Sequence, residues 1–289
     1  MRAEPRIAFC KASASYGPAY GRRPGNPRAD PPADPRRLRP RSQEPCHTTE
    51  KEPHVTLLHK GKTKDVHEHG KHTLRLVFTD RVTKNDAGEV DPGGNNLSED
   101  GAPGQGKACL SMTAVIFEHL AKHGVPTHMV SHNLADLSMF VRKATVFGSG
   151  LEWVCRWVGT GSFIRRYKNV PGVKDGMRFE SPVFEITIKD DAGGDPLIVP
   201  SAIAALGIIP ADRLNGLIEM NAKAMALIHD LFRERGLDLW DIKIEWGQDS
   251  ANDEFLLIDE VSANSCRAFD AESGEPVKGA ALSGRFAAA

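Results

Sequence analysis

The 289-residue sequence lacks any apolar run near the 18 or so residues of a membrane span, so no membrane-spanning helix is expected. It also lacks an excess of one charge. The 37 Lys and Arg against 38 Asp and Glu argue against a general binder of nucleic acid or membrane surfaces. Its five cysteines form no C-x-x-C pair, which makes a disulfide scaffold or zinc ribbon unexpected and favours a cytoplasmic location. The 40% hydrophobic and 26% charged content predicts one or two globular domains.

Residues 1–53 differ in composition from the rest of the chain. They hold ten of the 19 prolines, and 11 Lys and Arg against 6 Asp and Glu. Because few large apolar side chains occur there, the segment is predicted to be a disordered extension without chemistry of its own. It lacks the apolar core of a signal peptide, and its proline content disfavours the amphipathic helix of a transit peptide.

From His54 onwards, periodic patterns predict more strands than helices. Apolar runs and alternation predict strands at residues 55–58, 73–79, 127–131, 139–146, 151–158, 182–189, 239–246 and 254–261, the last two ending the chain's regular structure. Helical spacing predicts helices over residues 107–123 and 210–235, closed by Gly124 and Gly236. The strands look antiparallel, which favours an α+β fold, and the glycine-rich residues 80–106 are expected to form a long loop.

The segment 241–247, with the sequence DIKIEWG, carries the strongest chemical signal. Side chains alternate along a strand, so Asp241, Lys243 and Glu245 share one face and the apolar residues share the other. A solvated sheet face with ion pairs would give the same pattern. A site is favoured because the next strand runs directly into Asp259 and Glu260, and adjacent acids there are costly without a cationic partner. Either acid together with Glu245 would suit Mg²⁺, which prefers carboxylates and phosphate oxygens.

Two basic segments are suited to anions. Lys62 and Lys64 would point the same way on a strand beside a glycine, and such a pair suits a polyphosphate. Arg156 ends an apolar strand, and a Gly-Thr-Gly-Ser turn ending at Ser162 and two further arginines follow it. Backbone N–H groups, a hydroxyl and several guanidinium groups predict an anion-binding turn, with a solvated hairpin as the alternative.

Residues 101–107 match the G-x-x-x-x-G-K pattern of a phosphate-binding P-loop. However, Ala108 stands where that motif needs a Mg²⁺-binding Ser or Thr, and the polar residues before Gly101 cannot form the buried strand that it requires. A true P-loop is therefore not expected, whereas a glycine-rich flap near phosphates remains open.

Taken in order, these segments resemble the SAICAR synthetase family (phosphoribosylaminoimidazole-succinocarboxamide synthases). The matching segments are residues 61–64, 124–128, 154–156, 161–162, 165–166, 182–183, 189–191, 195–196, 241–247, 259–262 and 266–267, together with Asp270. The resemblance implies an α+β fold in which a small N-terminal antiparallel sheet domain, residues 54–138, packs over a larger ATP-binding domain, residues 139–289. It also implies a ligase that uses ATP and Mg²⁺ to condense aspartate with carboxyaminoimidazole ribotide, through an acyl phosphate, in purine biosynthesis.

The family's roles carry over to matching residues. The resemblance assigns nucleotide binding to Lys62, Lys64, Lys189, Glu245 and Asp259, and Mg²⁺ to the last two. It assigns catalysis to Lys243, Asp241 and Arg267, with Lys243 near the transferred phosphoryl group. It assigns the ribotide and the substrate carboxylates to Arg156, Ser162, Arg166, Asp195 and Arg267.

The sequence departs from the family at three places. Gln105 stands where a lysine is usual, Trp157 stands where asparagine is frequent, and the chain ends at Ala289 without the family's later basic segment. These departures leave two alternatives open: a ligase of the same fold that acts on another carboxylate or amine in specialised metabolism, and a nucleotide-binding protein without turnover. Small-molecule substrates are expected for both ligase interpretations, and assembly into a homo-oligomer is left open.

Overall fold

The computed structural model describes residues 56–84, 96–98 and 101–286. Contacts divide the chain between His54 and Val55, and the description that follows is of the unit that begins at Val55. The predicted extension, residues 1–53, lies outside the described residues.

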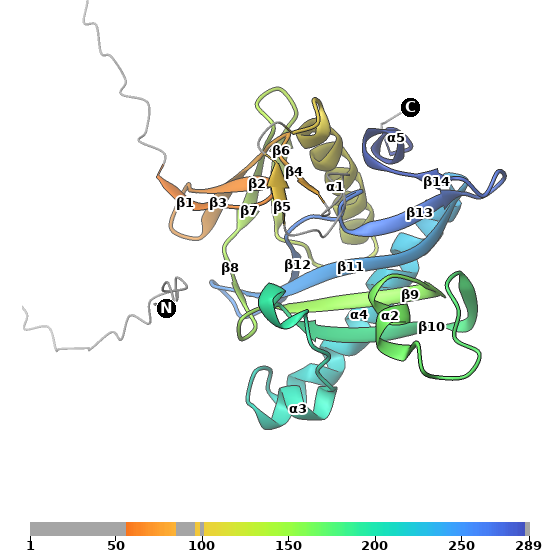
Figure 1. Ribbon diagram of the computed structural model, residues 1–289. Coiled ribbons are helices and arrows are strands. Elements are labelled where there is room, and N and C mark those ends of the chain that lie inside the picture. Colours follow the sequence, from red (N-terminus) through yellow and green to blue (C-terminus); the bar gives the residue numbers. More distant parts are fainter. Residues whose placement is uncertain (1–55, 85–95, 99–100, 287–289) are drawn as a thin grey trace, which may run out of the picture. The chain divides into compact units, whose positions relative to one another are not determined.

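A five-stranded antiparallel sheet forms the N-terminal part of this unit (Figure 1). In spatial order its strands are β1 (Leu57–Lys60), β2 (Lys64–Glu68), β3 (Thr73–Phe78), β7 (Ser138–Arg142) and β6 (Met129–Asn133). Sequence analysis missed β2, because its polar residues (KDVHE) lack apolar alternation. A separate pair, β4 (Val82–Lys84) and β5 (Asn96–Ser98), lies inside the predicted long loop. The predicted boundary after residue 138 falls at the start of β7, and the first sheet continues to Arg142; the division into domains stays a prediction.

A seven-stranded antiparallel sheet forms the larger part. Its main path runs β10 (Met177–Ile188), β9 (Leu151–Gly159), β11 (Leu237–Asp249), β13 (Cys266–Asp270) and β14 (Pro276–Val277), while β12 (Phe255–Ile258) and β8 (Ala144–Val146) also pair with β11. The predicted strand 139–146 is two strands in different sheets, β7 and β8. The expectation that regular structure ends near residue 261 is wrong, because β13, β14 and helix α5 (Gly279–Gly284) follow. These elements are short and carry too few apolar residues to show a period.

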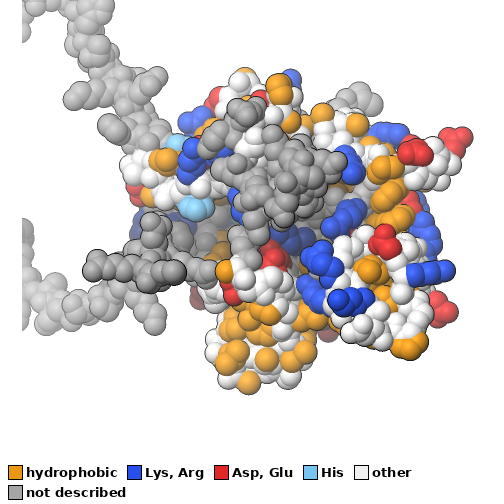
Figure 2. Space-filling model, in the orientation of Figure 1, with side chains coloured by type: hydrophobic (Ala, Val, Ile, Leu, Met, Phe, Trp, Pro, Cys, Tyr) orange, Lys and Arg blue, Asp and Glu red, His pale blue; other side chains and the backbone are white. Residues whose placement is uncertain are grey.

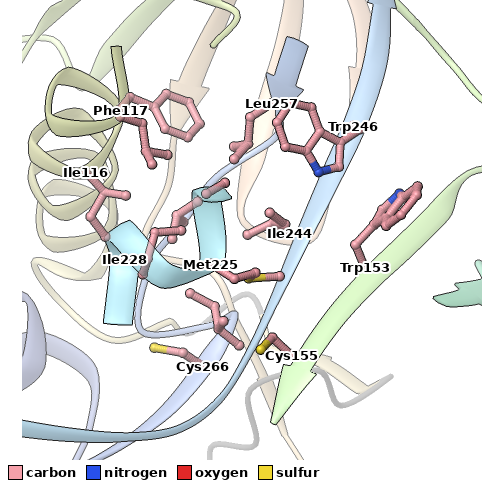
Figure 3. Packing of buried hydrophobic residues seen from close by; sticks show 14 of the residues in the cluster. Ile116, Phe117, Trp153, Cys155, Met225, Ile228, Ile244, Trp246, Leu257 and Cys266 are labelled. Carbon is pink, nitrogen blue, oxygen red and sulfur yellow. The ribbon is translucent and has the colours of Figure 1, made fainter. Parts of the chain in front are cut away.

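Two long helices, α1 (Gln105–Lys122) and α4 (Ala211–Arg233), pack against one face of the larger sheet. Figure 3 shows Phe117 of α1 beside Leu257 of β12, and Met225 of α4 near Ile244 of β11. Burying each such side chain contributes about 1.5–3 kcal/mol, so this layer is the main core of the fold. The unit also contains three short helical elements: α2 (Ser162–Tyr167), α3 (Pro200–Ala205) and the 3₁₀ turn η1 (Asp191–Gly193). Within the described part of the chain, none of the helices is both long and apolar enough to cross a membrane.

Alternation along β11 determines where polar side chains collect. Ile242, Ile244 and Trp246 are each 1% exposed on the helix-covered face. Asp241, Lys243 and Glu245 therefore share the opposite face, as predicted, and they make their polar contacts there with neighbouring strands. The packing that builds the core thus leaves a polar face where a site can form.

The buried thiols should be inert in the folded chain. Cys109 and Cys155 are almost fully buried, and burial raises the pKa of each thiol to about 12. At pH 8 only about one molecule in 10⁴ would carry either thiolate. We expect peptide mass spectrometry to find both unmodified after iodoacetamide treatment of the native protein and modified in urea. Native labelling at the rate of a free thiol would contradict this.

Candidate active site

A cavity of about 560 Å³ opens on the polar face of the larger sheet. Strands β9, β11 and β13, helix α2 and residues 276–278 line it, and this volume is typical of a small-molecule site. Figure 2 shows Lys and Arg side chains gathered on the face that carries α2. The charged side chains that line it are Glu152, Arg156, Arg165, Arg166, Asp195, Asp241, Lys243, Arg267 and Lys278.

Arg156 is the buried centre of one side-chain cluster. It lies directly opposite Asp241 in the β9–β11 register and is 3% exposed. Its Nε donates to Glu185 Oε2 at 2.7 Å, Nη1 to Asp241 Oδ2 at 2.6 Å, and Nη2 to Ser162 Oγ at 2.8 Å. The hydrogen bonds to the two carboxylates are short, and the carboxylates compensate a cation that burial would otherwise penalise.

Two further arginines join the same carboxylates. Arg267 Nη1 lies 2.5 Å from Asp241 Oδ2, and Arg166 Nη1 lies 3.0 Å from Glu185 Oε1. Gly161 has φ of 57°, a conformation that favours glycine in the turn before α2, and the Arg267 guanidinium lies against this glycine. Burial holds the pKa of Asp241 above its ordinary value despite the neighbouring arginines. Two carboxylates thus hold three guanidinium groups, and the cluster keeps donors available for an anion.

Lys243 follows Asp241 along the same face. Its Nζ lies 2.7 Å from Glu152 Oε1, and Thr187 Oγ1 donates to Glu152 Oε2 at 3.1 Å. Burial would lower the pKa of Lys243, but Glu152 outweighs burial and raises it, so the ammonium stays charged. The cation therefore lies on the cavity wall with a fixed position.

Glu245 and Asp259 form a third cluster, next along β11. Lys189 Nζ lies 2.8 Å from Glu245 Oε1, and Lys64 Nζ lies 2.6 Å from Asp259 Oδ1. Burial and the nearby negative charge of Asp259 raise the pKa of Glu245. The two carboxylates therefore lie close enough to interact. Burial would raise the pKa of Asp259, but Lys64 and Lys189 hold it well below its ordinary range.

Lys62 and Lys64 do not both lie on a strand, as their predicted pairing assumed, and their binding of a polyphosphate stays a prediction. Lys64 begins β2 and is buried, with Glu260 Oε2 at 3.3 Å as its second carboxylate neighbour. Burial would lower the pKa of Lys64, yet Asp259 and Glu260 together raise it. Lys62 lies in the bend before the strand and is exposed, so the two side chains face different environments. Alternation fails here because the strand begins only at Lys64.

The predicted site residues thus fall into connected groups. Arg156, Ser162, Arg166, Asp241, Lys243 and Arg267 line the cavity, as does Asp195, whose Oδ1 also accepts from the Asp190 N–H at 2.9 Å. Sequence analysis missed Glu152 and Glu185, which compensate these cations. Each is a lone acid in an otherwise apolar strand stretch, a signal that was present in the sequence.

Two departures from the family pattern have structural explanations. Trp157 faces α4 and stacks on His229 with ring centroids 4.5 Å apart, away from the cavity. Gln105 Nε2 donates to Asn264 Oδ1 at 3.1 Å, and Asn264 Nδ2 donates to Glu260 Oε1 at 3.4 Å. The amide at position 105 therefore links the start of α1 to the carboxylate beside Lys64.

The start of α1 is occupied by a carboxylate of the chain itself. Asp80 accepts from Gly104 N at 3.1 Å and from Gly106 N at 2.9 Å, while its carbonyl accepts from Ala102 N at 2.8 Å. A Cβ on Gly101 would lie 2.4 Å from that carbonyl. In this structure Asp80 fills the place that an anion would take at these amides, and the expectation that residues 101–107 are not a true P-loop stays a prediction.

Replacing Asp80 by alanine should destabilise the fold by about 1 kcal/mol, because two amides at the start of α1 lose their acceptor. The measurement is the free energy of unfolding in urea. Asp80→Asn keeps one acceptor oxygen and should lose less. An alanine variant as stable as the wild-type chain would show that water replaces the carboxylate without loss.

Comparison with known proteins identifies the family. The SAICAR synthetase family model matches residues 57–281. The chain is 37% identical over 228 residues to the phosphoribosylaminoimidazole-succinocarboxamide synthase of Clostridium tetani, covering 77% of this chain and 96% of that protein. It is 32% identical over 222 residues to that of Aquifex aeolicus, covering 76% and 95%.

Solved structures of the family share the fold. A type-2 SAICAR synthetase in complex with ADP gives a TM-score of 0.66 at 26% identity, covering 78% of this chain and 87% of that one. The enzyme of Pyrococcus horikoshii gives 0.63 at 26% identity, covering 74% and 87%. The predicted α+β fold and the predicted resemblance are both confirmed. Sequence, fold and clustered charges together establish that this chain belongs to the SAICAR synthetase family.

Proposed function

We propose that this chain is an ATP-dependent carbon–nitrogen ligase that condenses aspartate with carboxyaminoimidazole ribotide in purine biosynthesis. The observation that carries the proposal is the arrangement of charge along β11. An arginine cluster around Asp241, the cation of Lys243 and a lysine–carboxylate cluster around Glu245 follow one another on a single face. A reaction that joins anionic substrates and uses a polyphosphate needs these three environments side by side.

The residues around Glu245 fit a nucleotide with Mg²⁺. Glu245 and Asp259 offer carboxylate oxygens, while Lys64 and Lys189 offer cations for phosphates. Among the described residues, no group of three His, Cys, Asp or Glu side chains could hold a metal ion. Two carboxylates completed by phosphate oxygens and water suit Mg²⁺, which neutralises phosphate charge when bound.

The arginine cluster fits the ribotide and the carboxylate to be activated. Arg166 and Arg267 are partly exposed to the cavity, so their remaining N–H groups can donate to phosphate or carboxylate oxygens. Ser162 and Arg156 fix the turn that faces them. ATP supplies the phosphoryl group that makes the substrate carboxylate an acyl phosphate, and the amine of aspartate then displaces phosphate. Lys243 stabilises the charge of the transferred group, and Asp195 contacts substrate at the cavity rim.

Product formation from ¹⁵N-aspartate tests the proposal. We expect mass spectrometry to show ¹⁵N in a succinocarboxamide product that appears only with ATP, Mg²⁺ and the ribotide. If ATP protects the chain from thermal unfolding but no labelled product forms, the chain acts on another carboxylate or amine, or binds nucleotide without turnover. In this proposal the enzyme works in the cytoplasm on small molecules, without nucleic acid or membrane, and its assembly into an oligomer stays a prediction.

A further inference from the structure

His128 lies where the chain entering β6 is joined to β12. Its N–H donates to Leu257 O at 2.9 Å, and Leu257 N donates back to Pro126 O at 2.9 Å. The His128 carbonyl accepts from Arg142 N at 2.7 Å. The side chain is 5% exposed, and its ring packs edge-on against Phe117, with centroids 5.6 Å apart. Backbone bonds and ring packing therefore fix the imidazole from several sides.

The imidazole reaches the residue that ends β12. His128 Nε2 lies 3.2 Å from the carbonyl oxygen of Asp259. A carbonyl oxygen only accepts, so Nε2 must carry the proton and donate. Asp259 has φ of 67°, in the left-handed region, which residues with a side chain rarely adopt, although aspartate does so more readily than most. Its carboxylate lies 2.6 Å from Lys64 Nζ.

We propose that His128 is a positioning residue for the nucleotide–Mg²⁺ site. By holding the Asp259 carbonyl, the imidazole keeps the backbone left-handed, and this backbone directs the Asp259 carboxylate towards Lys64 and the environment of Glu245. Without the donor, the peptide can relax to an ordinary conformation and the carboxylate leaves its place. The inference rests on the proposed function, because Asp259 is one of the two carboxylates assigned to Mg²⁺.

Three substitutions separate the hydrogen bond from ring packing. His128→Phe keeps an aromatic ring against Phe117 but has no donor. His128→Gln keeps an amide donor long enough to reach the carbonyl, whereas His128→Asn is one methylene too short. The probe is a non-hydrolysable ATP analogue with Mg²⁺, titrated by calorimetry into the full chain.

We expect the analogue to bind about tenfold more weakly to the Phe and Asn variants, the effect of one lost hydrogen bond, and within about threefold of wild type to the Gln variant. The KM for aspartate should stay unchanged, which general damage to the fold would not allow. Arg213→Ala is a matched control, because Arg213 Nη2 donates to the carbonyl of another left-handed aspartate, Asp253, outside the cavity lining. It should bind the analogue as wild type does.

Wild-type binding by the Phe variant would overturn the inference, as would equal losses in the Gln and Asn variants. Should the Phe variant not fold, the comparison of Gln with Asn still decides. Failure of the wild-type chain to bind the analogue would overturn the proposed function as well. Binding by wild type together with unaltered binding by every His128 variant would overturn this inference alone.

Discussion

Arg156→Ala should lower the free energy of unfolding by about 3–5 kcal/mol, the loss expected when one partner of a buried ion pair is removed. Arg156 compensates two carboxylates, Glu185 and Asp241, that are 6% and 4% exposed. Arg166 and Arg267 remain as their second partners, but each is more exposed and further from the centre of the cluster. Removing the buried guanidinium therefore leaves two carboxylates undercompensated in a low-dielectric environment.

The matched control is Arg178→Ala on the neighbouring strand β10. Arg178 pairs with Asp238, but its side chain is 64% exposed, and an exposed pair contributes about 0–1 kcal/mol. Unfolding in urea measures both variants under the same conditions. Equal losses for the two arginines would show that the buried cluster is relaxed by water or rearrangement, contrary to this account.

Lys243→Met should lower kcat by about 10²–10³-fold while the KM for ATP changes little, because a cation placed at the cavity wall stabilises charge that develops during transfer. Steady-state kinetics with each substrate varied in turn makes the measurement. Lys223→Met on the exposed surface of α4 is the matched control and should keep wild-type kinetics. A Lys243 variant with an unchanged kcat would remove this residue from the catalytic machinery.

Stability must be separated from catalysis at this position. Removing Lys243 leaves Glu152, which is 6% exposed, with the hydroxyl of Thr187 as its one remaining side-chain donor among the described residues. A second substitution, Glu152→Gln, removes the unpaired charge. The double variant should recover most of the unfolding free energy but none of the activity. Recovery of both would mean that the lysine acts only by compensating Glu152.

Local pattern was enough to predict the centre of the fold and much of the site. The alternation of Asp241, Lys243 and Glu245 required one polar and one apolar face, and the helices over residues 105–122 and 211–233 cover the apolar one. Asp259 could be placed near Glu245 because β11 and β12 form a hairpin whose register sets Glu245 opposite Ile258. In each case the deciding interaction is local or joins neighbouring strands.

The strands and contacts that the sequence did not predict depend on pairing between segments that are distant in the chain. β2 is polar and short, and it is a strand because β1 and β3 flank it. Glu152 and Glu185 stand out as lone acids in apolar stretches, but their partners depend on β10, β9 and β11 lying in that order, which no local pattern encodes. Lys62 lies outside β2, because the bend before the strand continues to Thr63 and the strand begins only at Lys64. Asp80 is 24 residues from Gly104 in sequence, so no local pattern could predict its contact with the start of α1.

Release of ADP tests the central claim most directly. The purified chain would be given ATP, Mg²⁺, carboxyaminoimidazole ribotide and aspartate, and each would then be omitted in turn. The account predicts that ADP release requires all four components together. Release that continues without aspartate or without the ribotide, or no release while ATP still binds, would contradict the assignment of this cavity to the purine ligase reaction.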